Sequence, residues 1–94
     1  MGNQTKINIQ ANRKINKLLE DVRYCEVGLA GCTGGWGLTN CHRHKRAFYY
    51  GRPEWLWNYN QVCRACLNCH MALEQDPDKT ETIFYKLRGD DQLD

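Results

Sequence analysis

The chain has 94 residues, of which 41% are hydrophobic, 11% aromatic and 26% charged, with a formal net charge of +2. This length fits one small domain, and so many aromatic residues exclude a disordered chain. No apolar run approaches the ~20 residues that a membrane-spanning helix needs, and the N-terminus lacks the apolar stretch of a secretory signal. We therefore expect a cytoplasmic protein without a membrane partner.

The charges are unevenly distributed. Residues 1–73 have ten basic and four acidic side chains, a balance of +6, whereas residues 74–94 have three basic and seven acidic ones, a balance of −4. An excess of basic side chains over residues 1–73 favours contact with phosphate groups. Local clusters of basic residues are more informative than the net charge of the chain, because a zinc ion held by four thiolates would add −2 to that net charge.

The first two thirds of the chain alternate between regular and glycine-rich segments. Apolar residues at spacings of three and four predict an amphipathic helix over residues 5–22. Residues 25–37 contain five glycines and are predicted to form a loop. Residues 38–50 are predicted to be extended, Pro53 to begin a short helix, and residues 59–64 to form a second short strand.

Two helices are predicted in the last third. The first runs from about residue 70 to residue 75. Asp78 and Glu81 resemble a capping box at the start of the second, and Gly89 predicts its end. Residues 90–94 are expected to be a frayed acidic tail.

Six cysteines in a short chain of a reducing compartment indicate metal binding rather than disulfides. The strongest signal is Cys66-x2-Cys69, because two thiolates on one turn reach the same tetrahedral Zn²⁺. Cys25 and Cys32 are the candidates for the second pair. Six residues separate them, more than the usual ~2–4, but the glycines allow the loop to fold back. The sequence thus predicts a structural zinc site made of these four residues.

The same residues allow three alternatives. Cys66-x2-Cys69-His70 matches a c-type haem attachment string, although haem attachment normally needs export. Cys63-x2-Cys66-x2-Cys69 matches the first three cysteines of a motif that binds iron–sulfur clusters, but the fourth cysteine and the proline that end this motif are missing. Cys41 or Cys63 could also replace a zinc ligand from the loop; otherwise both are small buried side chains.

The three histidines lie close to cysteines in the sequence. His42 and His44 are two residues apart, so on a strand they face the same side. His70 directly follows Cys69 of the Cys66-x2-Cys69 turn, which we call the cysteine knuckle, and would start a helix. If zinc holds that helix start beside the strand, imidazoles from both elements face one point, where a second metal ion and a phosphate could bind.

These motifs together resemble the HNH, or His-Me finger, endonucleases, and in particular small phage-encoded members with a four-cysteine zinc. The resemblance covers roughly residues 24–89. It rests on five segments: Cys25…Cys32, Leu38–Arg46, Asn60–Val62, Cys66-x2-Cys69-His70 and Ile83–Gly89.

The resemblance implies a fold and a division of the chain. We expect a small zinc-stabilised α+β domain with a ββα-metal core, in which two antiparallel strands and a helix surround one catalytic divalent ion. The core would occupy residues 24–75 of a single domain spanning 1–94. An N-terminal helix (1–23) and a C-terminal helix with an acidic tail (76–94) would flank it.

The resemblance also implies roles for individual residues. His42 would be the general base, His44 an accessory catalytic residue, and Asn60 the residue that positions the base. His70 would bind the catalytic ion, such as Mg²⁺, Mn²⁺ or Ni²⁺. Neutral imidazole, with its ordinary pKa of ~6.5, can take a proton from the water that attacks phosphorus. Four basic side chains would contact flanking DNA phosphates: Arg43, Lys45, Arg46 and Arg52.

One position departs from the family pattern. Many such nucleases have a carboxylate or histidine ligand just before the base, where this chain has Cys41. A thiolate is a soft ligand that suits Mn²⁺, Ni²⁺ or Zn²⁺ better than Mg²⁺. The sequence therefore supports two hypotheses. One is a metal-dependent endonuclease that hydrolyses DNA phosphodiesters in the cytoplasm of a phage-infected host cell. The other is a catalytically degenerate zinc protein that binds DNA or inhibits a host protein.

Overall fold

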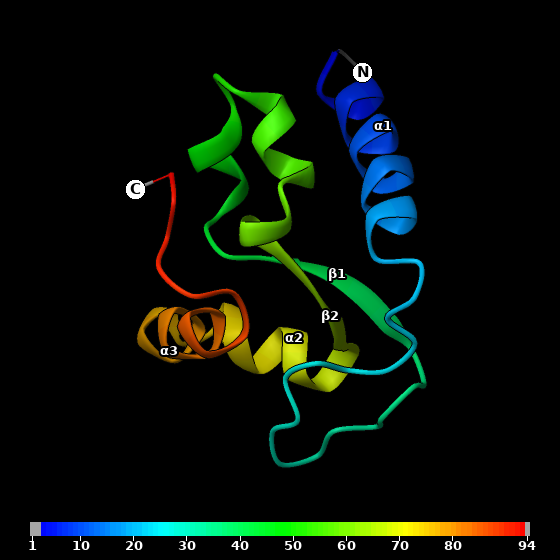
Figure 1. Ribbon diagram of the computed structural model, residues 1–94, viewed down its shortest axis with the longest axis vertical. Helices are drawn as coiled ribbons and strands as arrows, with labels where there is room; N and C mark the ends of the chain where they lie inside the picture. The colour runs from blue at the N-terminus through cyan, green and yellow to red at the C-terminus, as the bar shows by residue number, and fades with distance from the viewer. Residues whose placement is uncertain (1–2, 94) are drawn as a thin grey trace.

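The computed structural model describes residues 3–93 of the chain (Figure 1). These residues form three α-helices, a two-stranded antiparallel sheet and three short 3₁₀ helices, labelled η1–η3. In chain order the elements are α1 (Asn3–Leu18), β1 (Leu38–His42), η1 (Arg46–Tyr49), η2 (Pro53–Trp57), η3 (Tyr59–Gln61), β2 (Val62–Cys66), α2 (Leu67–Glu74) and α3 (Pro77–Arg88). The predicted α+β class is confirmed, and the predicted domain ends at residues 1–2 and 94 lie outside the described part. None of these helices has the length and apolarity needed to cross a membrane.

The sheet lies in the middle of the molecule, with α1 and the 3₁₀ helices on one side and α2 and α3 on the other (Figure 1). Leu38 pairs with Cys66 at one end, and His42 pairs with Val62 at the other. The backbone N–H of Arg43 also donates to the Gln61 carbonyl at 2.8 Å. The sheet thus carries the predicted histidine motif at one end and the cysteine knuckle at the other.

Both strands differ in extent from the prediction. The extended segment predicted over residues 38–50 ends at His42, and the chain then turns into η1, which buries Tyr49. The second strand, predicted over 59–64, begins only at Val62. The Asn58 side chain accepts from the Asn60 N–H at 2.9 Å and so favours the turn of η3 over a strand at this point.

The helix ends differ as well. α1 stops at Leu18 rather than at residue 22. α3 is capped by Asp76, whose side chain accepts from the Lys79 N–H at 3.0 Å, and not by Asp78 as predicted. Pro77 occupies the first turn of α3, where a missing N–H costs nothing. Gly89 follows the helix as predicted, at a φ of 78° that favours glycine.

Two hydrophobic clusters hold these elements together. The first packs α1 against the 3₁₀ helices and consists of Ala11, Ile15, Leu19, Tyr49, Leu56 and Val62. The second joins the sheet to α2 and α3 and consists of Cys41, Cys63, Ala65, Cys66, Cys69, Leu73 and Phe84. Cys41 and Cys63 are both buried and face each other across the two strands. Each cluster is small, so a metal ion would add substantially to the stability of the fold.

An ion pair between side chains that are 2% and 15% exposed ties α3 to the loop after α1. The Arg88 guanidinium lies 2.9 Å from the Glu26 carboxylate and also donates to the carbonyl of Tyr59 at 2.9 Å. The same Glu26 oxygen accepts from the Arg64 N–H at 2.8 Å. The Arg88–Glu26 pair therefore joins four parts of the fold: the loop that carries Cys25 and Cys32, β2, η3 and α3.

Replacing Arg88 by methionine is expected to lower the free energy of unfolding by about 3 kcal/mol, because it leaves the Glu26 carboxylate without its cationic partner. Urea denaturation of the zinc-loaded protein would measure this loss. Lys86→Met is the matched control, since Lys86 is exposed on the same helix. Equal denaturation midpoints for the two variants would contradict a stabilising role for the ion pair.

Candidate functional site

The four cysteines predicted to bind zinc are brought together in the structure. The sulfur atoms of Cys25, Cys32, Cys66 and Cys69 all lie within 4.8 Å of one another. Four sulfurs this close match a tetrahedral ion with metal–sulfur bonds of ~2.3 Å. The cluster could therefore hold a metal ion such as zinc.

The glycine-rich loop explains how a spacing of six residues closes. Cys25 N–H donates to the Gly34 carbonyl at 2.9 Å, and Gly34 N–H in turn points at the Cys32 sulfur at 3.4 Å. Between the two cysteines, Gly28 and Gly31 have φ values of 68° and 82°. Residues with a side chain rarely adopt these angles, so the glycines are what fold the loop back on itself.

The electrostatics of the cluster favour a bound cation. Backbone N–H groups of Thr33 and Cys69 lower the pKa of Cys66 to about 6. Burial raises the pKa of Cys69 to about 12. Burial opposes ionisation of the Cys69 thiol, and a bound metal ion would offset that cost by holding its ligand sulfurs as thiolates.

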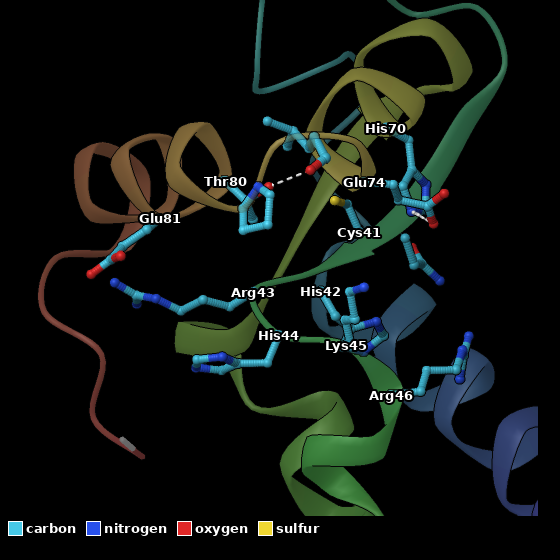
Figure 2. Close-up of a pocket in the computed structure, with 13 residues that line it drawn as sticks. Cys41, His42, Arg43, His44, Lys45, Arg46, His70, Glu74, Thr80 and Glu81 are labelled. Atoms are coloured by element: carbon cyan, nitrogen blue, oxygen red, sulfur yellow. Dashed lines mark hydrogen bonds and ion pairs between the residues drawn. The ribbon is translucent and has the colours of Figure 1, made fainter.

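A cavity of about 660 Å³ lies between the His42 end of β1, α2 and α3 (Figure 2). All three histidines line it, so strand β1, the segment after it and helix α2 each contribute an imidazole to one cavity. The polar and basic lining also includes Asn40, Cys41, Arg43, Lys45, Arg46, Glu74, Thr80 and Glu81.

His42 is oriented by a backbone carbonyl. Its Nε2 lies 2.8 Å from the carbonyl oxygen of Leu56. Because a carbonyl only accepts, Nε2 carries the ring proton and Nδ1 keeps its lone pair. Burial of the ring lowers the pKa of His42 to about 4, and the Leu56 carbonyl opposes this shift. His42 is therefore a neutral imidazole at pH 7, with Nδ1 free to accept a proton.

Asn60, predicted to position the base, makes its contacts elsewhere. Its Nδ2 donates to the carbonyls of Arg88 and Asp90 at 3.2 and 2.9 Å, and its Oδ1 accepts from the Gln92 N–H at 3.0 Å. These bonds hold the segment after α3. The contact that orients His42 comes from the Leu56 carbonyl, and residue types do not reveal such a backbone partner.

The Thr39 hydroxyl orients the His70 ring. Its Nδ1 lies 2.7 Å from the Thr39 hydroxyl, which already donates its own proton to the Ala65 carbonyl at 2.7 Å. Nδ1 must therefore be the donor, and Nε2 is the nitrogen left to bind a proton or a metal ion. That nitrogen lies 3.2 Å from a carboxylate oxygen of Glu74. A lone pair facing a carboxylate needs a proton or a cation between them, and an imidazole–carboxylate pair is a common metal-ligand combination.

Glu74 was missed by the sequence analysis, which assigned only His70 to the catalytic ion. The signal was available, because residues four apart on a helix lie on the same face. The Glu74 carboxylate and His70 project together from α2 into the cavity that Cys41 also lines (Figure 2).

The four basic residues predicted to contact phosphates have different surroundings. Lys45 and Arg46 are exposed at the rim of the cavity, and Arg46 donates to the Asn8 side chain of α1 at 3.0 Å. Arg43 is buried and donates to the Gly89 carbonyl at 2.6 Å. Arg52 is exposed, lies 3.9 Å from Glu54, and is not part of the cavity lining.

The segment after α3 is not the frayed acidic tail that was expected. Asp91 accepts a hydrogen bond from the His44 ring through one carboxylate oxygen and from Gln61 Nε2, at 2.8 Å, through the other. These contacts, together with Leu93 N–H at 3.1 Å, hold the pKa of Asp91 below its usual range although partial burial raises it. The C-terminal segment therefore contacts one residue of the cavity lining, His44.

No protein-family profile, curated protein sequence or solved structure matches this chain. The likeness to HNH endonucleases thus stays a prediction from the residues, while the four-cysteine cluster in a small α+β fold is observed.

Proposed function

We propose that the chain is a zinc-stabilised, metal-dependent endonuclease of the HNH type, which hydrolyses DNA phosphodiesters with His42 as the general base. One observation carries the proposal. A single cavity is lined by two imidazoles held in different ways: His42, whose Nδ1 keeps its lone pair, and His70, whose Nε2 faces the Glu74 carboxylate.

His42 has the properties required of a base that is unprotonated at neutral pH. Its Nδ1 would take the proton of a water molecule as that water attacks phosphorus. The bond from Nε2 to the Leu56 carbonyl holds the ring and stabilises the charged form that results. A bound phosphate would raise the pKa of the ring from its low value in the free protein, because a nearby anion favours the protonated form.

His70 and Glu74 fit the requirements for the catalytic ion, since a cation can replace the proton on His70 Nε2 and also bind the Glu74 carboxylate oxygen 3.2 Å away. When bound, a divalent cation there would neutralise the charge that builds on the phosphate and the leaving oxygen. Cys41 is the softest donor in the lining, which favours Mn²⁺ or Ni²⁺ over Mg²⁺.

Substrate binding would depend on charge rather than on base sequence. Lys45 and Arg46 are exposed at the cavity rim and suited to phosphate oxygens, which carry no sequence information. Plasmid nicking by the zinc-loaded protein, in Mg²⁺, Mn²⁺ or Ni²⁺ in turn, tests the proposal. We expect nicking that EDTA abolishes and that Mn²⁺ or Ni²⁺ supports best.

Glu74→Gln is expected to raise the concentration of divalent ion needed for half-maximal nicking by at least ~10-fold, because the ion loses its anionic ligand. Titration of Mn²⁺ in the nicking assay measures the shift. Glu81→Gln makes the same chemical change at another position of the cavity lining, on α3, and should leave the ion requirement unchanged. Equal shifts in both variants would mean that the cavity attracts cations through general charge alone.

A second candidate is a zinc protein that binds DNA or a host protein without cutting. The buried thiol of Cys41 in the cavity wall favours it, since hard ions bind thiols poorly. This candidate predicts no nicking in any ion, combined with DNA retention that weakens as salt increases, or with capture of a protein partner.

A further inference from the structure

We infer that Asp91 is a positioning residue, which fixes the His44 ring at the cavity so that His44 contacts the substrate phosphate through Nδ1. This inference rests on the proposed nuclease function and assigns a role in it to the C-terminal segment. His44 and Asp91 are 47 residues apart in the chain and meet through a hydrogen bond from His44 Nε2 to Asp91 Oδ2.

The segment that carries Asp91 is built into the domain. Arg43 Nη2 donates to the Gly89 carbonyl at 2.6 Å, and Asn60 Nδ2 donates to the Asp90 carbonyl at 2.9 Å. Asn60 also accepts from the Gln92 N–H at 3.0 Å. Arg43 and Asn60 are only 7% and 4% exposed, so they anchor the segment from inside the fold.

The Asp91 carboxylate is itself held in one orientation. Its Oδ1 accepts from Gln61 Nε2 at 2.8 Å, which leaves Oδ2 to face His44. Gln61 is fully buried, and its Oε1 accepts from the Tyr49 hydroxyl at 2.9 Å. That hydroxyl accepts in turn from the His44 backbone N–H at 3.2 Å. The four residues form a closed ring of hydrogen bonds that begins and ends at His44.

The His44 ring is restrained on its face as well as at its edge. It stacks on Phe48 with ring centres 4.0 Å apart and an angle of 27° between the planes. Since a carboxylate only accepts, Nε2 carries a proton and Nδ1 is the nitrogen left for a substrate. Within residues 3–93, Nδ1 has no hydrogen-bond partner, and the ring lines the cavity. With a proton on Nδ1, the ring would donate to a phosphate oxygen while Nε2–H stays on Asp91.

The kinetic test is a double-mutant cycle with Asp91→Asn, His44→Ala and the double variant, each checked for zinc content and near-UV circular dichroism. We expect Asp91→Asn to lower kcat for nicking at least ~10-fold with KM within about twofold, and to have almost no effect in the His44→Ala background. Asp90→Asn makes the same charge change one residue away, on an exposed side chain, and should match the unmodified protein.

Two outcomes would overturn the inference. An equal loss of kcat from Asp91→Asn with and without His44 would make Asp91 a purely structural residue. A gain of activity in Asp91→Asn would mean that its carboxylate blocks the phosphate site.

A spectroscopic measurement separates this inference from the proposed function. In long-range ¹⁵N–¹H spectra of the histidine rings, Asp91→Asn should shift the ring nitrogen signals of His44 and leave those of His70 unchanged. Unchanged His44 signals in a protein that nicks DNA would overturn the inference alone. Shifted His44 signals in a protein that nicks nothing would establish the pairing and overturn both the nuclease function and the catalytic role assigned to the pair.

Discussion

Replacing Cys69 by alanine is expected to leave the chain unfolded at room temperature. Structural zinc supplies an apparent ~10–16 kcal/mol in small domains, which is as large as the ~5–15 kcal/mol by which most domains are stable. The two hydrophobic clusters here are small, and the one that contains Cys69 also contains its partner ligand Cys66. Loss of one thiolate therefore removes both the ion and the organisation of that cluster. Circular dichroism and elemental analysis would measure folding and zinc content.

Cys63→Ala is the matched control for this prediction. Cys63 and Cys69 are 0% and 1% exposed and belong to the same hydrophobic cluster, but only Cys69 is among the four clustered sulfurs. Cys63→Ala should keep one equivalent of zinc and lose about 1 kcal/mol of stability. A folded Cys69→Ala protein with a full equivalent of zinc would remove Cys69 from the site. A zinc-free Cys63→Ala protein would show that the ligand set is different.

The cysteine cluster could be predicted because its chemistry depends on residue type. The Cys66-x2-Cys69 turn fixes two ligands locally, and the glycines at positions 28 and 31 allow the distant pair to close. That His42 and His70 line one cavity followed from the same logic, since the Cys66-x2-Cys69 turn joins the end of β2 to the start of α2.

The rest of the site depends on contacts that sequence patterns do not encode. The segment over residues 46–61 folds into three 3₁₀ helices, which are too short to show the periodic spacing of apolar residues from which a helix is predicted. The Leu56 carbonyl of this segment orients His42. Asp91 looked like one charge in an acidic tail, because its partner Gln61 is 30 residues away in the chain. Both are tertiary contacts that become visible only once the chain is folded.

His42→Ala is expected to lower the rate of DNA nicking by ~10²–10⁴-fold, the usual contribution of a general base. Zinc content should stay the same, because His42 and the cysteine cluster lie at opposite ends of the sheet. Tyr50→Ala removes an aromatic side chain that is 62% exposed outside the cavity lining, and should nick at the normal rate. Nicking by His42→Ala at the rate of Tyr50→Ala would exclude His42 as the base.

The pH dependence of kcat/KM tests the same assignment without a mutation, since it follows ionisation in the free enzyme. Burial lowers the pKa of His42 to about 4, so the ring stays neutral and able to accept a proton as the pH falls. We therefore expect kcat/KM to be kept from pH 8 down to about pH 5, where a histidine with the ordinary pKa of ~6.5 would already be mostly protonated. A loss of kcat/KM centred near pH ~6.5 would contradict a base with the lowered pKa of His42.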